Sequence, residues 1–137
     1  QAQGTLTMDY QIADFIIRIK NASFSRSRKV IMPYSKVVKE IGNVLVKGGF
    51  LKSIKEEKVE GRKVLEATVK FDKRSPAISD VNIISKPSLR VYASAKNIPE
   101  IQKKGMNTIV ISTSRGIMLG SDAYRKGVGG EVLFKIL

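Results

Sequence analysis

The stretch I-V-I-S-T-S-R-G-I-M at residues 109–118, followed by G-V-G-G-E-V-L at residues 127–133, is the most informative part of this chain. An apolar β run leads into three hydroxyls, a cation and a glycine: Ser112, Thr113, Ser114, Arg115 and Gly116. Small hydroxyls beside an arginine at a strand end suit contacts to sugar 2′-OH groups and phosphates. An ordinary polar hairpin turn is the alternative interpretation, in which these groups meet only water.

The glycines at residues 127–130 do not form a nucleotide-binding motif. A dinucleotide fingerprint would need glycine at position 132, which is Val132, and the chain contains no P-loop pattern. We expect these glycines to end a helix and then to allow close backbone packing into the last strand. Gly129, Gly130 and Glu131 are therefore predicted to support the hydroxyl turn. Glu131 either orients Arg115 or a turn hydroxyl, or faces solvent.

The charge of the chain predicts an anionic partner. Its 137 residues carry a net charge of +13, of which residues 1–74 hold +8 and residues 75–137 hold +5. Such self-repulsion favours nucleic acid over a membrane surface as the partner. The hydrophobic content of 42% is enough for a packed core.

The absent residue types exclude several classes of site. Without cysteine or histidine the chain forms no disulfide, no usual zinc, haem or iron–sulfur site, and no Ser–His or Cys–His catalytic arrangement. The possible acidic pairs are Glu56 with Glu57 and Asp122 with Glu131, and the first lies at a hairpin tip, where catalysis is hard to arrange. We therefore predict no enzyme activity, no cofactor and no metal. No apolar run reaches the length of a membrane span.

The periodicity predicts an α+β fold of two small lobes. The N-terminal lobe, residues 8–72, is expected to run α-β-α-β-β. Its first helix carries an apolar stripe at Ile12, Phe15, Ile16 and Ile19 after an N-cap at Asp9, and its second begins at an N-cap Ser35 and ends at Gly48-Gly49. A short strand stopped by Pro33 lies between them, and a hairpin with its loop at residues 57–62 follows.

Residues 72–76 are the best candidate for a linker. The C-terminal lobe, residues 77–137, is expected to be mostly antiparallel β with short helices. Its strands are predicted at residues 78–85, 89–93, 108–112, 116–119 and 131–137. One short helix is capped by Asn97 and another by Ser121 and ended by Gly127. Residues 1–7 precede Met8 and are interpreted as a short native extension or a remnant before the natural start; they have no signal-peptide pattern.

Two further sites are suggested by residue patterns. Arg90 and Tyr92 share one face of a strand, where an exposed tyrosine beside an arginine could stack on an unpaired base; a half-buried strand tyrosine is the alternative. Ser35 and Lys36 lie at a helix N-terminus, where backbone donors and the helix dipole favour binding of a phosphate. The alternative is that Ser35 serves only as the N-cap of the helix. The basic segment at residues 21–29 is either a phosphate contact or a solvated loop.

Residues 8–137 resemble the bacterial-type ribosomal protein eight of the small subunit. The segments that carry the resemblance are D-Y-Q-I-A-D-F-I-I-R-I-K-N-A (9–22), V-I-M-P-Y-S-K (30–36), G-F-L (49–51), S-K-P-S-L-R-V-Y (85–92) and the two motifs of residues 109–133. The pattern S-T-S-[RK]-G-[IV]-M followed by G-x-G-G-E is highly specific. Two places depart from the family pattern: Ser88 replaces the usual glycine, and Leu119-Gly120-Ser121 replaces the usual Thr-Asp.

The resemblance implies a structural RNA-binding protein located in the cytoplasm, in the ribosome, and leaves an organellar ribosome open. Its partners would be the central domain of small-subunit ribosomal RNA, neighbouring ribosomal proteins and, in some members, the protein's own operon messenger RNA. The family's RNA-contacting loop corresponds to residues 112–116, and its strand tyrosine to Tyr92. Further contacts in the N-terminal lobe correspond to Arg18, Asn21, Ser35 and Lys36.

Two other classes of function remain as alternatives. A DNA-binding regulator would use the helix that follows Ser35 as a recognition element, although few outward residues on that helix could read bases. A polybasic membrane-surface protein would need a strongly amphipathic basic helix with large apolar anchors, which neither helix supplies.

Overall fold

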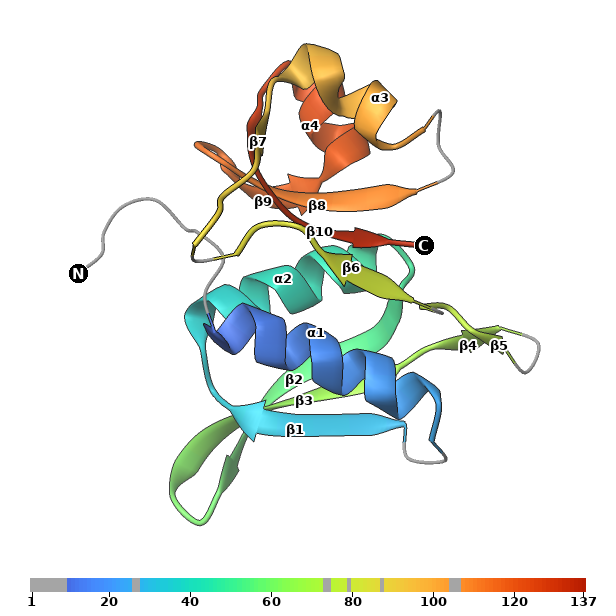
Figure 1. The fold of residues 1–137 in the computed structure, drawn as a ribbon. Helices are drawn as coiled ribbons and strands as arrows, with labels where there is room; N and C mark the ends of the chain where they lie inside the picture. Colours follow the sequence, from blue (N-terminus) through green and yellow to red (C-terminus); the bar gives the residue numbers. More distant parts are fainter. Residues whose placement is uncertain (1–9, 26–27, 73–74, 79, 87, 104–106) are drawn as a thin grey trace. The chain divides into compact units, whose positions relative to one another are not determined.

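The computed structural model describes residues 10–25, 28–72, 75–78, 80–86, 88–103 and 107–137 (Figure 1). The described chain is mixed α and β and divides into two compact units, Tyr10–Asp80 and Val81–Leu137, here called the first and second lobes. The predicted α+β class with two lobes is therefore confirmed. Met8 and Asp9, the expected start and N-cap, lie outside the described residues.

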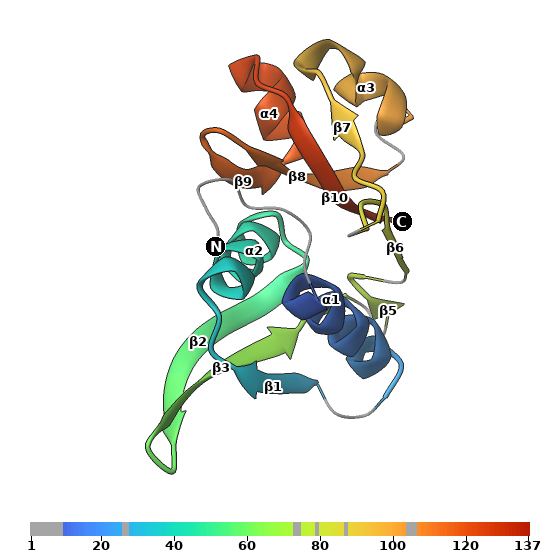
Figure 2. The ribbon, with the colours of Figure 1, turned by 60° about the vertical axis from the view of Figure 1, so that its left-hand side comes forward.

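The first lobe consists of two helices on one face of a three-stranded antiparallel sheet (Figures 1 and 2). Helix α1 spans Tyr10–Ser23 and α2 spans Lys36–Lys47; the sheet has the order β1-β3-β2, with β1 at Lys29–Pro33, β2 at Leu51–Val59 and β3 at Arg62–Val69. The predicted stripe of α1 is buried, with Ile12, Phe15 and Ile19 fully inaccessible. This stripe holds α1 on the sheet, because burying one large apolar side chain stabilises the folded state by about 1.5–3 kcal/mol.

The predicted boundaries of α2 are confirmed. Ser35 is its N-cap, and the Ser35 hydroxyl accepts a hydrogen bond from the Val38 N–H at 3.4 Å. Gly48 is its C-cap, and Gly49 follows with a φ of +85°. An N-cap hydroxyl accepts a hydrogen bond from one of the backbone N–H groups that the first turn of a helix leaves without a partner. Ser35 therefore marked the start of α2 in the sequence.

The β2–β3 turn is tighter than predicted. Only Glu60 and Gly61 connect the two strands, and both have positive φ, at 54° and 80°. Two positive φ values are the signature of the two-residue turn whose twist matches a β-hairpin. Residues 57–59 and 62, expected in the loop, therefore belong to the strands.

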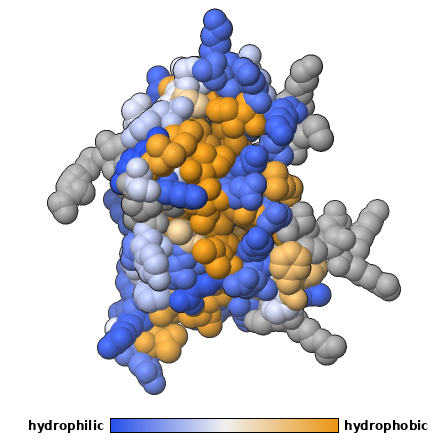
Figure 3. All heavy atoms as spheres, in the orientation of Figure 1, coloured by the Kyte–Doolittle hydropathy of each residue, from blue (hydrophilic) through white to orange (hydrophobic). Residues whose placement is uncertain are grey.

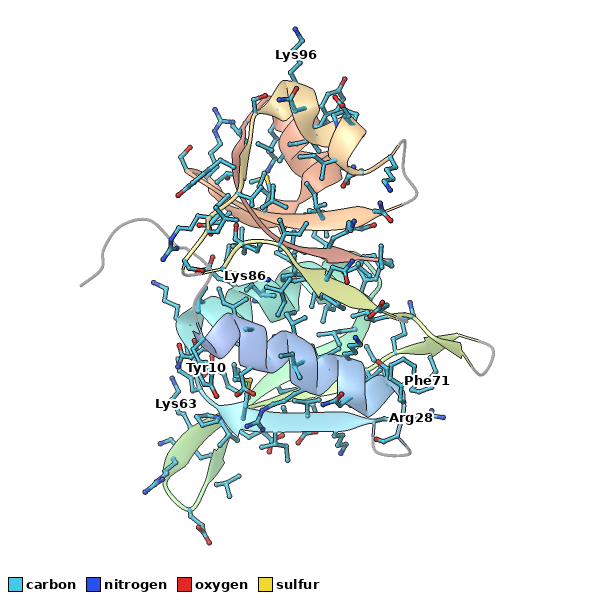
Figure 4. All side chains as sticks on the ribbon, in the orientation of Figure 1. Tyr10, Arg28, Lys63, Phe71, Lys86 and Lys96 are labelled. Carbon is cyan, nitrogen blue, oxygen red and sulfur yellow. The ribbon has the colours of Figure 1, made fainter. Side chains whose placement is uncertain are left out.

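The segment proposed as a linker lies within the first lobe. Phe71–Asp72 forms β4 and Ser75–Pro76 forms β5, and the two strands pair antiparallel. Arg28 lies with its guanidinium carbon 4.5 Å from the centre of the Phe71 ring (Figure 4). Polarity and a proline do not distinguish a linker from a short hairpin, so the lobe boundary at Asp80 could not be located from composition.

The second lobe is built around one long central strand. Strand β10, Gly130–Ile136, pairs on one side with β8, Thr108–Thr113, and on the other with β6, Val81–Ile83, and β7, Tyr92–Ala93. Strand β9, Gly116–Leu119, pairs with β8 and completes the antiparallel sheet. The sheet and its helices enclose a core that includes Ile98, Ile109, Ile111, Ala123 and Val132.

Strands β6 and β7 are shorter than the sequence predicted. The segment before β7 is held by loop contacts: Ser85 Oγ accepts the Val91 N–H at 2.9 Å, and Lys86 forms an isolated bridge with Leu89. Ser88 lies within this bridged turn. A segment forms a strand only where it pairs with a neighbouring strand. Strand β10 pairs with this segment at only two positions, Tyr92 and Ala93, so β7 is short.

The two short helices also differ in detail. Helix α3, Ile98–Ile101, begins after a short 3₁₀ turn, η1, at Ala95–Asn97; Asn97 is its N-cap residue as predicted but makes no side-chain capping bond. Helix α4, Gly120–Lys126, starts after Leu119, so Ser121 lies inside it and the predicted Ser121 cap is wrong. A Cβ on Gly120 would come within 2.5 Å of Ile109, so the start of the helix packs this closely only because residue 120 is a glycine. Gly127 ends α4 as predicted, with a φ of +72°.

Candidate nucleic-acid interface

The S-T-S-R-G motif forms the end of strand β8, a tight turn and the start of β9. Thr113 pairs with Gly116, which leaves Ser114 and Arg115 as the two turn residues. Thr113 Oγ1 accepts the Arg115 N–H at 3.0 Å and donates to the Gly116 carbonyl at 2.8 Å. Gly116 has a φ of +110°, a conformation that side-chain-bearing residues rarely adopt. Side-chain hydrogen bonds and one glycine therefore shape this turn.

The three hydroxyls of the motif have different environments. The Ser112 side chain is only 6% exposed, and Thr113 is half-buried and engaged in the turn. Ser114 and Arg115 are exposed, and within the described part of the chain neither side chain makes a hydrogen bond or ion pair. The motif therefore presents one hydroxyl and one guanidinium at its tip, rather than three hydroxyls and a guanidinium.

Tyr92 lies on the same face of the sheet as Ser112. Glu131 of β10 is directly opposite Tyr92 on one side and Ser112 on the other, and residues directly opposite each other in antiparallel strands point to one face. Strands lie about 4.8 Å apart, so the Tyr92 and Ser112 backbones are separated by roughly 10 Å. The Tyr92 side chain is 63% exposed, which contradicts the half-buried alternative.

Glu131 is paired with Arg90, and the alternative in which it faces solvent is wrong. It is 2% exposed, and its carboxylate lies 3.8 Å from the Arg90 guanidinium. The arginine that accompanies this carboxylate therefore comes from the segment before β7, whereas the sequence had suggested Arg115. A buried carboxylate is costly unless a cation accompanies it, so Glu131 keeps Arg90 beside the sheet close to Tyr92.

Gly129 and Gly130 allow the close backbone packing predicted for them. A Cβ at Gly129 would lie 2.4 Å from the Ala93 carbonyl oxygen, and one at Gly130 would lie 2.0 Å from the Ser112 carbonyl oxygen. Both approaches are to backbone, which cannot rotate away as a side chain could. The two glycines therefore set how closely β10 approaches β7 and the end of β8.

Residues that the sequence did not single out lie beside Tyr92. A surface pocket is lined by Tyr92, Ala93, Asn97, Glu100 and Ile101. Asn97 and Glu100 come from η1 and α3, which lie next to β7 only because the second lobe folds them there. No local sequence signal connects them to Tyr92.

The candidate residues of the first lobe form two groups. Ser35 is buried, caps α2 and also donates to Gln11 Oε1 at 3.2 Å, whereas Lys36 is exposed. Arg18 donates to Asp14 at 3.1 Å and to the Ile31 carbonyl at 3.1 Å, and Asn21 is exposed beside it in the lining of one surface pocket. The Ser35 hydroxyl and the Arg18 guanidinium thus have structural partners, while Lys36 and Asn21 face solvent.

The structure does not favour α2 as a DNA recognition helix. Lys39, one of its outward residues, is paired with Glu56 of β2, and only Lys36, Asn43 and Lys47 are exposed on the helix. Within the described ranges, no helix is long and apolar enough to cross a membrane, and no cluster of acidic, cysteine or histidine side chains could hold a metal ion.

Comparisons with known proteins identify the family of the chain. The sequence model of a family described as ribosomal protein S8 matches residues 10–137. The small ribosomal subunit protein uS8 of Streptomyces griseus is 41% identical over 129 residues, covering 93% of this chain and 97% of that protein. The uS8 proteins of Acidithiobacillus ferrooxidans and Mycoplasmopsis agalactiae are 39% and 42% identical over 122 and 123 residues, each covering 89% of this chain and 92% of the relative.

These matches extend over nearly the whole of both lobes. The chain is a non-catalytic α+β protein, and it belongs to the ribosomal protein S8 family. It is therefore a structural protein of the small ribosomal subunit and not an enzyme, which confirms both the resemblance and the expected location.

Proposed function

We propose that this protein binds the central domain of small-subunit ribosomal RNA directly and helps that domain to assemble. The observation that carries the proposal is the tip of the β8–β9 turn. There Thr113 and Gly116 hold the backbone, while Ser114 and Arg115 point outward without a partner in the described chain. A free hydroxyl and guanidinium on a rigid turn suit the 2′-OH groups and phosphates of an irregular RNA helix.

The neighbouring residues add the other requirements of RNA recognition. Tyr92 offers an exposed ring for stacking on an unpaired base, and Arg90 lies beside it on its Glu131 anchor. The net charge of +13 supplies affinity through the release of counterions from the phosphates. A similarly shaped structure in the protein's own messenger RNA would use the same surface, which is how repression of translation would follow.

The hydroxyl of Ser114 provides the first test. Ser114→Ala should weaken binding to a transcript of the central domain by about 1–2 kcal/mol, because it removes one hydrogen bond to a polar partner. Filter binding measures the affinity. Ser121→Ala, which removes an exposed hydroxyl from α4, is the matched control and should bind like the unaltered protein. Unchanged affinity in the Ser114 variant would remove the turn from the interface.

A further inference from the structure

The helix-covered face of the first-lobe sheet continues outward into a charged surface. Leu65 and Ala67 of β3 are buried on this face beneath the helices. The pairs Glu56↔Leu65 and Lys58↔Lys63 place Glu56, Lys58 and Lys63 on the same face, because alternate residues along a strand point the same way. The ladder of β1 with β3 ends at Pro33↔Val64, so Lys58 and Lys63 lie on the part of the β2–β3 hairpin that projects beyond β1 (Figure 1).

Glu56 holds two of the surrounding ammonium groups in place. Its carboxylate accepts a hydrogen bond from Lys39 of α2 and lies 3.3 Å from the Lys63 ammonium. The bond from Lys39 lowers the pKa of Glu56, and the same bond raises the pKa of Lys39. Lys63 also lies 4.4 Å from the centre of the Tyr34 ring. Both lysines are thus oriented, yet their side chains remain 37% and 53% exposed.

The cations on this face outnumber the acids. Lys58 lies directly opposite Lys63, and like charges at opposite positions of a strand pair are destabilising. Lys36 precedes Lys39 by one helical turn and is exposed beside it. Glu56 lies among these lysines, Glu57 lines one pocket with Glu56, Lys58 and Lys63, and Glu40 follows Lys36 by one helical turn. The four lysines still outnumber these three acids, and Glu56 holds two of the lysines, Lys39 and Lys63, in place.

We propose that Lys36, Lys39, Lys58 and Lys63, of which Glu56 holds Lys39 and Lys63, form a second RNA contact that binds the phosphate backbone of a helical segment. This inference rests on the proposed RNA-binding function and extends it to a surface of the first lobe that is separate from the β8–β9 turn. We name these four lysines the hairpin basic face. Sequence analysis identified only Lys36 among them.

The surroundings favour a phosphate backbone over an acidic protein segment. Protein interfaces are centred on aromatic or large apolar anchors, whereas the Tyr34 ring on this face is covered by Lys63. The space-filling view shows the projecting hairpin as mostly hydrophilic (Figure 3). Exposed ammonium groups attract a partner through its charge, which suits the repeated phosphates of a nucleic-acid backbone.

The double variant Lys58→Gln/Lys63→Gln tests the proposal. Removing one lysine–phosphate pair should reduce the slope of log affinity against log salt by about 0.7–0.9, and near 0.15 M salt it should weaken binding to the central-domain transcript about fivefold. The affinity of the double variant should therefore fall about 20-fold or more. If the Lys63 substitution destabilises the fold, Lys58→Gln alone carries the test, with the slope change expected for a single phosphate.

The other face of the same hairpin provides a matched control. Lys55 and Arg62 are exposed there, and Lys55→Gln/Arg62→Gln removes the same charge. We expect this control to change the salt slope far less. Equal reductions in affinity for the two double variants, or an unchanged slope in Lys58→Gln/Lys63→Gln, would overturn the proposal. In the second case an acidic protein segment would become the partner of this face. Ser114→Ala in the same assay separates this result from the proposed function, since failure of the turn leaves that variant unchanged.

Discussion

The two exposed hairpins of this protein have turns of the same length and are built in different ways. In the β2–β3 hairpin the backbone alone makes the turn, through positive φ at Glu60 and Gly61. In the β8–β9 hairpin the Thr113 side chain makes it, by bonding both the Arg115 N–H and the Gly116 carbonyl. The first design needs no side chain to form its turn, so the exposed side chains of the projecting strands can carry charge. In the second design the Thr113 hydroxyl forms the turn, which fixes the positions of Ser114 and Arg115.

This difference separates affinity from specificity. Lysines on the projecting strands of β2–β3 contribute charge whose effect depends weakly on exact position. Ser114 and Arg115 are held on a shaped turn supported by β10, where a small displacement would separate them from the groups they bind. We therefore expect damage to the second hairpin to change selectivity for structured RNA, and damage to the first to change mainly the salt dependence.

The largest effect is expected where β10 touches the end of β8. Gly130→Ala would place a Cβ 2.0 Å from the Ser112 carbonyl oxygen, so the strands must separate. We expect the free energy of unfolding to fall by about 3 kcal/mol, as for strong overpacking, measured by urea denaturation. Gly61→Ala, where nothing lies within 4 Å and only the positive φ opposes a side chain, is the control and should cost about 1 kcal/mol. Equal destabilisation by the two substitutions would contradict the packing role of Gly130.

Reversing the charge at the tip of the second hairpin should come next in magnitude. Arg115→Glu removes one phosphate contact and adds repulsion, so binding to the central-domain transcript should fall about 20-fold near 0.15 M salt, with a shallower salt slope. The same filter assay measures both. Arg125→Glu on α4 is the control, since its side chain is exposed and pairs only locally with Asp122 in the described chain. A similar decrease in both variants would mean that only the net charge matters.

A smaller effect is expected from the hydroxyl that shapes the turn. Thr113→Val keeps the side-chain volume but removes both turn hydrogen bonds, which should lower the free energy of unfolding by about 1 kcal/mol. RNA affinity should fall as well, because Ser114 and Arg115 are then no longer held in fixed positions. Thr108→Val at the other end of β8 is the control and should leave affinity unchanged. An affinity that survives Thr113→Val would show that the turn needs no side-chain support.

The smallest effect concerns the anchor of the first hairpin. The hydrogen bond from Lys39 lowers the pKa of Glu56, so the carboxylate stabilises the folded state above its unfolded pKa of about 4.3. This stability should disappear as pH falls through the lowered folded pKa. The difference in unfolding free energy between the protein and Glu56→Gln should therefore shrink from pH 7 to pH 3. A difference that stays constant over this range would be inconsistent with an ionised, paired Glu56.

Local sequence signals predicted much of the first lobe. The i, i+3, i+4, i+7 stripe of α1 and the Ser35 cap of α2 act within one or two helical turns, so they could be identified without knowing any partner. Where the sequence offered no local signal, prediction failed in detail. Ser121 looked like a helix cap, but Gly120 packs against Ile109 and starts α4 earlier.

The candidate site divides in the same way. The sequence by itself determined that a basic chain would bring hydroxyls, an arginine and a glycine to a turn after a β run, and that close-packing glycines would precede the last strand. Only the tertiary structure decided which of these groups are presented. It buried Ser112, engaged Thr113, paired Glu131 with Arg90 and placed Tyr92 two strands from Ser112. The physical reason is that periodicity and capping depend on neighbours along the chain, whereas exposure and cross-strand partners depend on β10, which is far away in sequence and adjacent only after folding.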